Sequence, residues 1–272
     1  MKKKFLILSI LLFVMMDIYS QNNADKEYFS FTIGPSFPVG GYAKKDFQNL
    51  AAGFAKAGGA VNISYYRLMG KKTGITATLL GQINPLNTSA VAQTFNQVPF
   101  NSFGFGSQPG QLPPANETIY PNWHVDNRSW KIAALMFGGY GEFNSGNGSK
   151  ISFVTRALIG ALYASSPSLK ASSFTDTAAA YLTQSSGSAV GFSFLLGAGV
   201  KYKITSRISL LSGIEYLGST KLSFKNIKAV VTTTKGSEGS PEHTVSQGFT
   251  TGNATQNFNA LNLNFGIGLN FN

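Results

Sequence analysis

The chain has 272 residues, of which 12% are charged, 13% are aromatic and 30 are glycine, and its formal net charge is +11. This charged fraction is roughly half the globular average of about 25%, and a chain poor in charge but rich in aromatics and glycine is typical of a sheet that faces lipid. The absence of cysteine excludes disulfides and a lipidated cysteine.

The first twenty residues have the three parts of a secretory signal. Three basic residues at 2–4 precede an apolar run at 5–16 and a polar exit at 17–20, and we expect cleavage after Ser20. Residues 21–272 then form one domain with a net charge of +9. The apolar run is shorter than the ~20 residues that a membrane helix needs, and no later stretch reaches its length, so a helical membrane protein is excluded.

Eight later segments of about ten residues alternate apolar with small or polar side chains, which is the pattern of strands with one apolar face. In chain order they are residues 29–39, 58–68, 74–84, 130–140, 150–165, 190–204, 208–216 and 261–271. The fourth segment places Trp130 and Tyr140 at the two ends of an apolar face. Ten residues span roughly 25 Å of membrane when the strand is tilted about 40°, so we interpret this pair as marking two aromatic girdles.

The spacers between these segments alternate in length. Short spacers lie at 69–73, 144–149 and 205–207, and long ones lie at 41–57, 85–128, 166–187 and 225–256. Short periplasmic turns and long extracellular loops are the arrangement of bacterial outer-membrane barrels with both termini in the periplasm. The sequence therefore predicts an all-β fold, an eight-stranded antiparallel up-and-down transmembrane β-barrel. Residues 229–234 also have β character, which would extend the last hairpin beyond the membrane, and a short helical turn is one interpretation of 175–184. A count of ten strands stays an alternative.

Two segments carry a family resemblance: 34–40, with the sequence Gly-Pro-Ser-Phe-Pro-Val-Gly, and 265–272, with Phe-Gly-Ile-Gly-Leu-Asn-Phe-Asn. The chain resembles the outer-membrane β-barrel domain family of Bacteroidetes, and its architecture is similar to the small OmpA-type and OmpX-type barrels. The resemblance implies a location and a fold rather than one activity, without a peptidoglycan-binding domain after Asn272. It also implies that Phe271 is the aromatic residue by which the barrel assembly machinery recognises the chain.

Two charges, Arg156 and Glu215, alternate to the inside of the predicted barrel at similar heights above the short turns. A small barrel is filled by side chains, so we expect a structural ion pair in the lumen. The alternative is a gate or a narrow ion path.

No catalytic, cofactor or metal site is predicted. The two histidines, His124 and His243, both lie in long loops, and His124 with Asp126 and Ser129 is only a local order of residue types. No group of His or carboxylate residues has the spacing of metal ligands.

The leading functional hypothesis is a non-enzymatic outer-membrane barrel that acts through its extracellular loops as a structural or binding protein, within an envelope complex or toward a surface ligand. A small solute pore is the alternative, and a lipid-modifying enzyme is a distant third. The expected partners are outer-membrane lipids, lipopolysaccharide and the barrel assembly machinery. Nucleic acid is not expected as a partner, because an exported barrel does not meet it and the positive charge suits anionic lipid.

Overall fold

The computed structural model describes residues 27–45, 52–70, 72–97, 122–144, 149–175, 178–235 and 244–271. Eight strands close an antiparallel barrel in the order β1-β13-β10-β9-β6-β5-β3-β2. The barrel strands are β1 (Glu27–Pro38), β2 (Gly58–Leu68), β3 (Thr73–Pro85), β5 (Ser129–Asn144), β6 (Ile151–Ser165), β9 (Ser188–Lys203), β10 (Ile208–Ser219) and β13 (Asn259–Phe271). The predicted fold class is confirmed, and the barrel has eight strands rather than ten.

The barrel closes between its first and last strands, where Glu27 is opposite Phe271 and Phe37 is opposite Leu261. The described chain therefore enters and leaves the barrel at the same end, which is also the end of the short connections β2–β3, β5–β6 and β9–β10. We call this the short-turn end. The opposite, long-loop end carries the four long connections, as the alternation of spacer lengths predicts.

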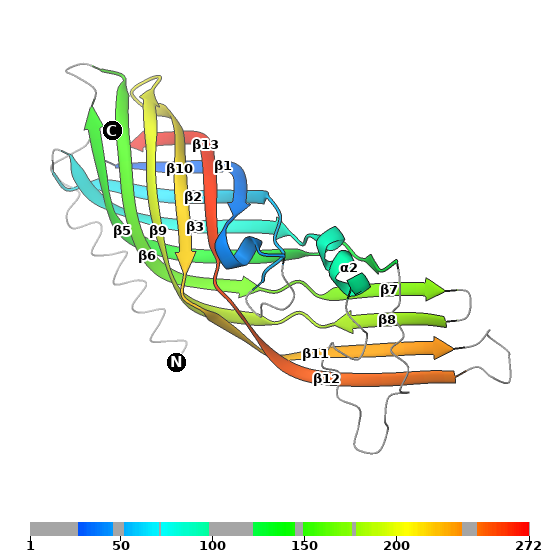
Figure 1. Cartoon of the computed structure of the whole chain (residues 1–272). Helices are drawn as coiled ribbons and strands as arrows, with labels where there is room; N and C mark the ends of the chain where they lie inside the picture. The colour runs from blue at the N-terminus through cyan, green and yellow to red at the C-terminus, as the bar shows by residue number, and fades with distance from the viewer. Residues whose placement is uncertain are drawn as a thin grey trace.

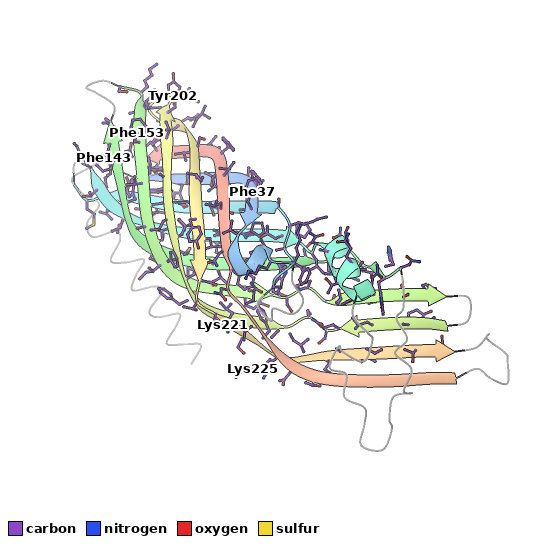
Figure 2. All side chains as sticks on the ribbon, viewed as in Figure 1. Phe37, Phe143, Phe153, Tyr202, Lys221 and Lys225 are labelled. Carbon is purple, nitrogen blue, oxygen red and sulfur yellow. The ribbon has the colours of Figure 1, made fainter. Side chains whose placement is uncertain are left out.

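The outer face of the barrel is apolar. Along β13, Phe265, Ile267 and Leu269 are exposed, while Asn262 and Asn264 face the lumen and are buried. This division follows directly from alternation, because successive side chains of a strand point to opposite faces of a sheet. Figure 2 shows Phe143, Phe153 and Tyr202 on the outside near the short-turn end. The exposed ring of large hydrophobic side chains around the barrel is called the apolar belt below.

The long connections contain a second sheet of five strands, in the order β12-β11-β8-β7-β4. Its strands are β4 (His124–Val125), β7 (Leu169–Thr175), β8 (Ala178–Gln184), β11 (Leu222–Lys235) and β12 (Thr244–Gln256). Figure 1 shows β7, β8, β11 and β12 running out beyond the barrel. In the chain, β7 follows the barrel strand β6 and β8 precedes β9, while β11 follows β10 and β12 precedes β13. The second sheet therefore continues one side of the barrel wall.

Two expectations about the long connections meet different outcomes. The β character of 229–234 is confirmed, because these residues lie in β11. The helical turn expected at 175–184 is wrong, since Ala178–Gln184 forms β8, which is hydrogen-bonded to β7 on one side and to β11 on the other. Pairing on both sides overrides the helix preference of its three consecutive alanines.

In the part of the chain that the structure describes, two short helices pack at the long-loop end. The 3-10 helix η2 (Gly40–Ala43) follows β1, and α2 (Thr88–Gln97) follows β3 and lies beside the second sheet (Figure 1). No helix in the described ranges is long and apolar enough to cross a membrane.

Candidate functional site: the filled lumen and the second sheet

The predicted lumen pair lies in the middle of the barrel. Arg156 of β6 and Glu215 of β10 are buried, and the Nη2 atom of Arg156 forms an ion pair with Oε1 of Glu215. The structure therefore brings together the two charges that the sequence places inside the barrel. Gly197 of β9 lies between them in register, and a Cβ atom there would come within 3.1 Å of both side chains. A glycine at this position leaves the two side chains room to meet.

Neutral polar groups surround the pair. The Nη1 atom of Arg156 donates hydrogen bonds to Tyr66 Oη at 2.8 Å and to Ser64 Oγ at 3.1 Å. The second carboxylate oxygen of Glu215 accepts from Asn62 Nδ2 at 3.1 Å. A buried ion pair offsets its desolvation only when further hydrogen bonds complete it, and these partners, all on β2, supply them. The pair therefore fits a structural role.

A cluster of tyrosines closes the lumen on the short-turn side of the pair. The rings of Tyr28 and Tyr66 stack at 4.3 Å between centroids, and Tyr140 meets Tyr66 edge-on at 5.0 Å. Lys201 Nζ lies 4.0 Å from the centroid of the Tyr28 ring and 3.1 Å from Glu142 Oε2. This second lumen ion pair is not among the sequence predictions, although the alternation of residues 190–204 does turn Lys201 away from the apolar face.

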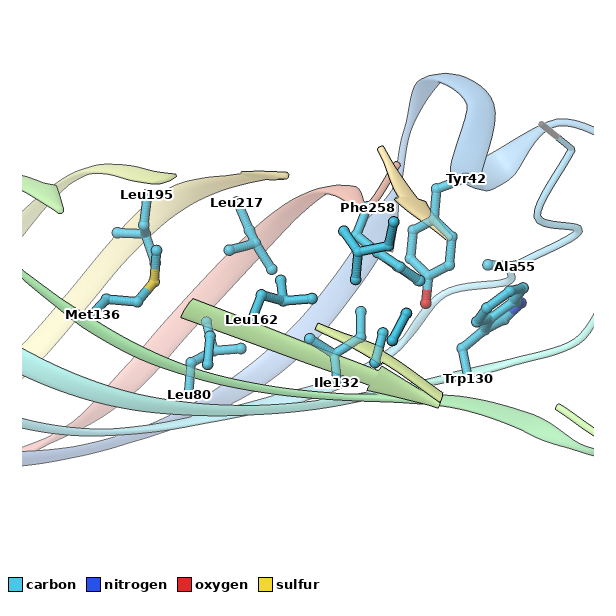
Figure 3. Packing of buried hydrophobic residues seen from close by; sticks show 14 of the residues in the cluster. Tyr42, Ala55, Leu80, Trp130, Ile132, Met136, Leu162, Leu195, Leu217 and Phe258 are labelled. Atoms are coloured by element: carbon cyan, nitrogen blue, oxygen red, sulfur yellow. The ribbon is translucent and has the colours of Figure 1, made fainter. Parts of the chain in front are cut away.

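An apolar plug fills the lumen on the other side of the pair. It consists of Tyr42, Ala55, Leu80, Trp130, Ile132, Ala134, Met136, Leu158, Leu162, Ala164, Ala189, Leu195, Leu217, Leu222, Phe224, Ile227 and Phe258. Figure 3 shows part of the plug, with Leu195 and Leu217 on one side, Leu80 and Ile132 on the other, and Tyr42 of η2 beside them. Along β6 the inward order is Val154, Arg156 and Leu158, which places the tyrosine cluster, the ion pair and the plug in successive layers.

The plug is anchored where the first long connection folds over the barrel. Trp130 Nε1 donates to the carbonyl oxygen of Gly53 at 2.8 Å, and Tyr42 Oη donates to Asn84 Oδ1 at 3.2 Å. Burial raises the pKa of the Tyr42 phenol well above its ordinary value, so it stays a neutral donor. These bonds satisfy the polar atoms of two large aromatics inside an apolar layer.

The predicted aromatic girdle of Trp130 and Tyr140 is wrong. Both side chains are buried, at 8% and 3% exposed, and both point into the lumen. On β5 the outward residues are instead Leu135 and Phe137, at 50% and 51% exposed. Both faces of β5 carry apolar side chains, because the inner face contributes to the plug. Alternation alone therefore assigns the wrong set of side chains to the outer face.

Several buried polar atoms between the plug and the tyrosine cluster lack a partner. They are Thr32 Oγ1, Asn62 Oδ1, Thr76 Oγ1, Asn262 Oδ1 and both side-chain polar atoms of Asn264. A cavity of about 50 Å³ is lined by Thr32, Asn264 and the ion pair. Such polar and roomy sites hold internal water, so this layer suits hydration rather than a larger ligand.

The second sheet has one covered face. Leu169, Ala171, Ala180, Leu182 and Val231 of the sheet pack in one cluster with Val91 and Phe95 of α2 and with Phe54, Leu86, Trp123 and Val125. The opposite face is open, with Phe174 and Tyr181 exposed and their rings 5.6 Å apart. Within the described ranges, the predicted loops at this end therefore include a sheet with a core of its own.

The two edges of the second sheet differ. At one edge, β4 is only two residues long, and α2 packs beside it. At the other edge, β12 pairs with β11 from Thr244 to Gln256 and, within the described ranges, with no other strand. The second edge therefore presents a long row of backbone donors and acceptors.

Of the remaining residues singled out from the sequence, His124 and Asp126 lie on β4 and just after it. Asp126 forms an ion pair with Arg128 at 3.5 Å, while His124 pairs in register with Ser172 of β7. His243 and residues 1–20 lie outside the described ranges. The described residues contain no cluster of three or more His, Asp or Glu side chains that could hold a metal ion. Phe271 is exposed at the short-turn end and meets the Phe29 ring at 5.6 Å, and its role in assembly stays a prediction.

The comparisons with known proteins find structural similarity without sequence similarity. No family model matches the sequence, and no curated protein matches it. Among solved structures, Neisserial surface protein A has a TM-score of 0.40 and 11% identity, with 90% of this chain and 97% of that chain covered. Ail, the attachment invasion locus protein of Yersinia pestis, has a TM-score of 0.37 and 15% identity, covering 91% and 99%. A major outer membrane protein of Thermus thermophilus has a TM-score of 0.42 and 12% identity, covering 90% and 99%.

Proposed function

We propose that the protein is a non-enzymatic outer-membrane barrel that binds an extended segment of another protein along the β12 edge of its second sheet. The long-loop end then faces the cell exterior and both termini face the periplasm. The observation that carries this proposal is the open β12 edge on a sheet that stands beyond a filled barrel. The apolar belt and the closed set of strands are the features that a barrel needs to span lipid.

The filled lumen argues against the alternative of a solute pore. A solute would have to pass the plug, the Arg156–Glu215 layer and the tyrosine cluster in succession. The small cavity beside the ion pair, at about 50 Å³, has room for water but not for a sugar or an amino acid. The barrel is therefore best suited to anchor the second sheet.

The chemistry of β12 supports strand addition. Its thirteen residues, Thr-Val-Ser-Gln-Gly-Phe-Thr-Thr-Gly-Asn-Ala-Thr-Gln, include no charged residue and no proline. Proteins commonly protect exposed edges with lysine, proline or bulges to prevent pairing with other chains. An unprotected edge offers main-chain hydrogen bonds to an added strand, which is how several peptide-binding domains hold extended partners.

Site-specific photo-crosslinking in the intact cell envelope tests this proposal. A photoreactive side chain at Thr251, which is exposed in the middle of β12, should give a discrete crosslinked product with a partner protein. The same group at Ser206, exposed in the turn between β9 and β10, is the matched control and should not. Substituting Phe249 by proline should abolish the product. Its register partner Val230 directs its backbone groups toward β8, so the backbone N–H of Phe249 points to the open edge, and proline cannot donate a hydrogen bond there. Equal products from Thr251 and Ser206, or none from Thr251, would count against the proposal.

We also propose that Phe271 is the aromatic residue recognised by the barrel assembly machinery, because it shares the outer face of the alternating last strand with Phe265, Ile267 and Leu269. An origin in Bacteroidetes is proposed on the resemblance carried by residues 34–40 and 265–272. The test is the rate at which a Phe271→Ala variant inserts into the membrane, measured by heat-modified gel mobility after pulse labelling. Slower insertion than the wild type would support the assembly role, and insertion at the wild-type rate would contradict it.

A further inference from the structure

Five exposed lysines lie on the outer face of the protein where the barrel continues into the second sheet. They are Lys131 of β5, Lys170 of β7, Lys221 immediately before β11, and Lys225 and Lys228 of β11. Their neighbours in sequence point the other way: Trp130 and Phe224 belong to the plug, and Leu169 to the core of the second sheet. Because alternate side chains of a strand point to opposite faces, these five, called the exterior lysines, share the face of the apolar belt.

The exterior lysines begin where the apolar belt ends. On β6 and β9 the last large apolar pair in register is Tyr163 and Val190, both exposed. The next outward pair is Ser165 and Ser188, and Lys131 of β5 is in register with Ser165. Figure 2 shows Lys221 and Lys225 at the start of the second sheet, far from the labelled aromatics of the short-turn end. This position corresponds to the headgroup depth of a membrane that covers the belt.

The exterior lysines have no counter-charge within the described residues. The four described carboxylates are each engaged by another cation: Glu27 by Arg67, Asp126 by Arg128, Glu142 by Lys201 and Glu215 by Arg156. A concentration of unpaired positive charge at one depth of the membrane attracts anionic headgroups. The apolar belt next to it requires that the occupant also has acyl chains.

Farther from the belt, the same face changes from cationic to aromatic and hydroxylic. Lys170 of β7 is in register with Thr183 of β8, and Ser172 is in register with Tyr181. Phe174 and Tyr181 are 59% and 42% exposed, and they form an edge-on pair. Aromatic rings and hydroxyl groups beside ammonium groups suit the apolar faces and hydroxyls of a phosphorylated sugar.

We propose that this face binds a phosphorylated glycolipid of the surrounding leaflet. The exterior lysines hold its phosphate groups, the belt contacts its acyl chains, and Tyr181 and Phe174 lie against its sugars. This inference rests on the membrane-spanning barrel but not on strand addition at β12. It can therefore fail while the proposed function stands, and the reverse also holds.

Lipid retention by the intact barrel tests the inference. The barrel is reconstituted with phosphatidylcholine and bisphosphorylated lipid A and then extracted into mild detergent. Native mass spectrometry measures how much lipid remains bound to the protein. We expect bound lipid A on the wild type and about a hundredfold weaker binding for the triple variant Lys221→Gln, Lys225→Gln and Lys228→Gln, from the usual contribution of each basic residue near an anionic surface. Dephosphorylated lipid A should bind the wild type as weakly as lipid A binds the variant.

A second triple variant, Lys150→Gln, Lys203→Gln and Arg207→Gln, is the matched control. It removes the same charge from exposed positions at the short-turn end, and it should retain lipid A as the wild type does. Heat-modified gel mobility verifies that each variant is folded. Equal retention by the two triple variants, equal retention of dephosphorylated lipid A, or displacement of lipid A by excess inorganic phosphate would overturn the assignment to a glycolipid.

Discussion

At the scale of single residues, the buried charges of the lumen remain ionised only because of the groups around them. Arg156 is held by Glu215 and by the hydroxyl groups of Ser64 and Tyr66, all of them buried. Neither charge could remain ionised alone in this position without a large desolvation cost. The pair could be predicted from the sequence because both charges interrupt otherwise alternating strands at similar distances from the short turns.

Removing one charge of the pair should destabilise the barrel. We expect Glu215→Gln to lower the free energy of unfolding by about 3–5 kcal/mol, because it leaves the Arg156 guanidinium buried without a counter-charge. The measurement is denaturant unfolding in detergent micelles. The control is the double variant Arg156→Met, Glu215→Leu, which should be more stable than Glu215→Gln since it removes both charges together. A single variant as stable as the wild type would show that the pair contributes nothing.

Other residues of the lumen could not be predicted from alternation. The sequence pattern assigns Trp130 and Tyr140 to the outside because they bracket apolar residues, but their strand is apolar on both faces. Which face of β5 points inward is decided by the plug, which contains residues of several strands and Tyr42 of η2. The sequence of a single strand does not reveal such long-range packing. A clue is present in Leu158 and Leu162, which alternate to the lumen side of β6 and are both part of the plug.

At the scale of elements, the membrane strands were predictable, whereas the second sheet was not, apart from residues 229–234 of β11. Strands that face lipid repeat their pattern over ten residues, whereas β7 and β8 have seven residues each, and mix small, hydroxylic and apolar side chains. Their structure depends on pairing with β11 and on the core that they share with α2. Tertiary contacts of this kind override local propensity, so the sequence pattern correctly located long connections without revealing their architecture.

A bulge in β11 makes an element-level prediction. The register with β12 shifts between Phe224 and Ile227, and Asn226 in the bulge has φ of 57°. Asparagine tolerates this left-handed conformation, while a β-branched residue does not. We expect Asn226→Val to cost about 1–2 kcal/mol of unfolding free energy and Asn226→Gly to be close to neutral. The control Lys225→Val changes an exposed neighbour, and an equal loss for both valine variants in denaturant unfolding would contradict the role of the bulge.

At the scale of the whole molecule, the two ends of the barrel differ in structure. The short-turn end joins the first and last strands, and the long-loop end carries a sheet with its own core and an open edge. Between them the lumen is filled in successive layers, from the tyrosine cluster through the ion pair to the plug. On this account the membrane part contributes position and stability, and binding belongs to the second sheet and to the outer face beside it.

The measurement that tests this division most directly is the conductance of the purified barrel in a planar lipid bilayer. The plug and the tyrosine cluster each cross the lumen, so we predict no steady channels at any applied potential that the bilayer tolerates. The triple variant Leu162→Ala, Leu217→Ala, Phe258→Ala removes three large side chains of the plug. Its conductance is compared with that of the wild type. Steady, reproducible channels of porin size from the wild-type barrel would contradict the account, because they would require an open path through the lumen.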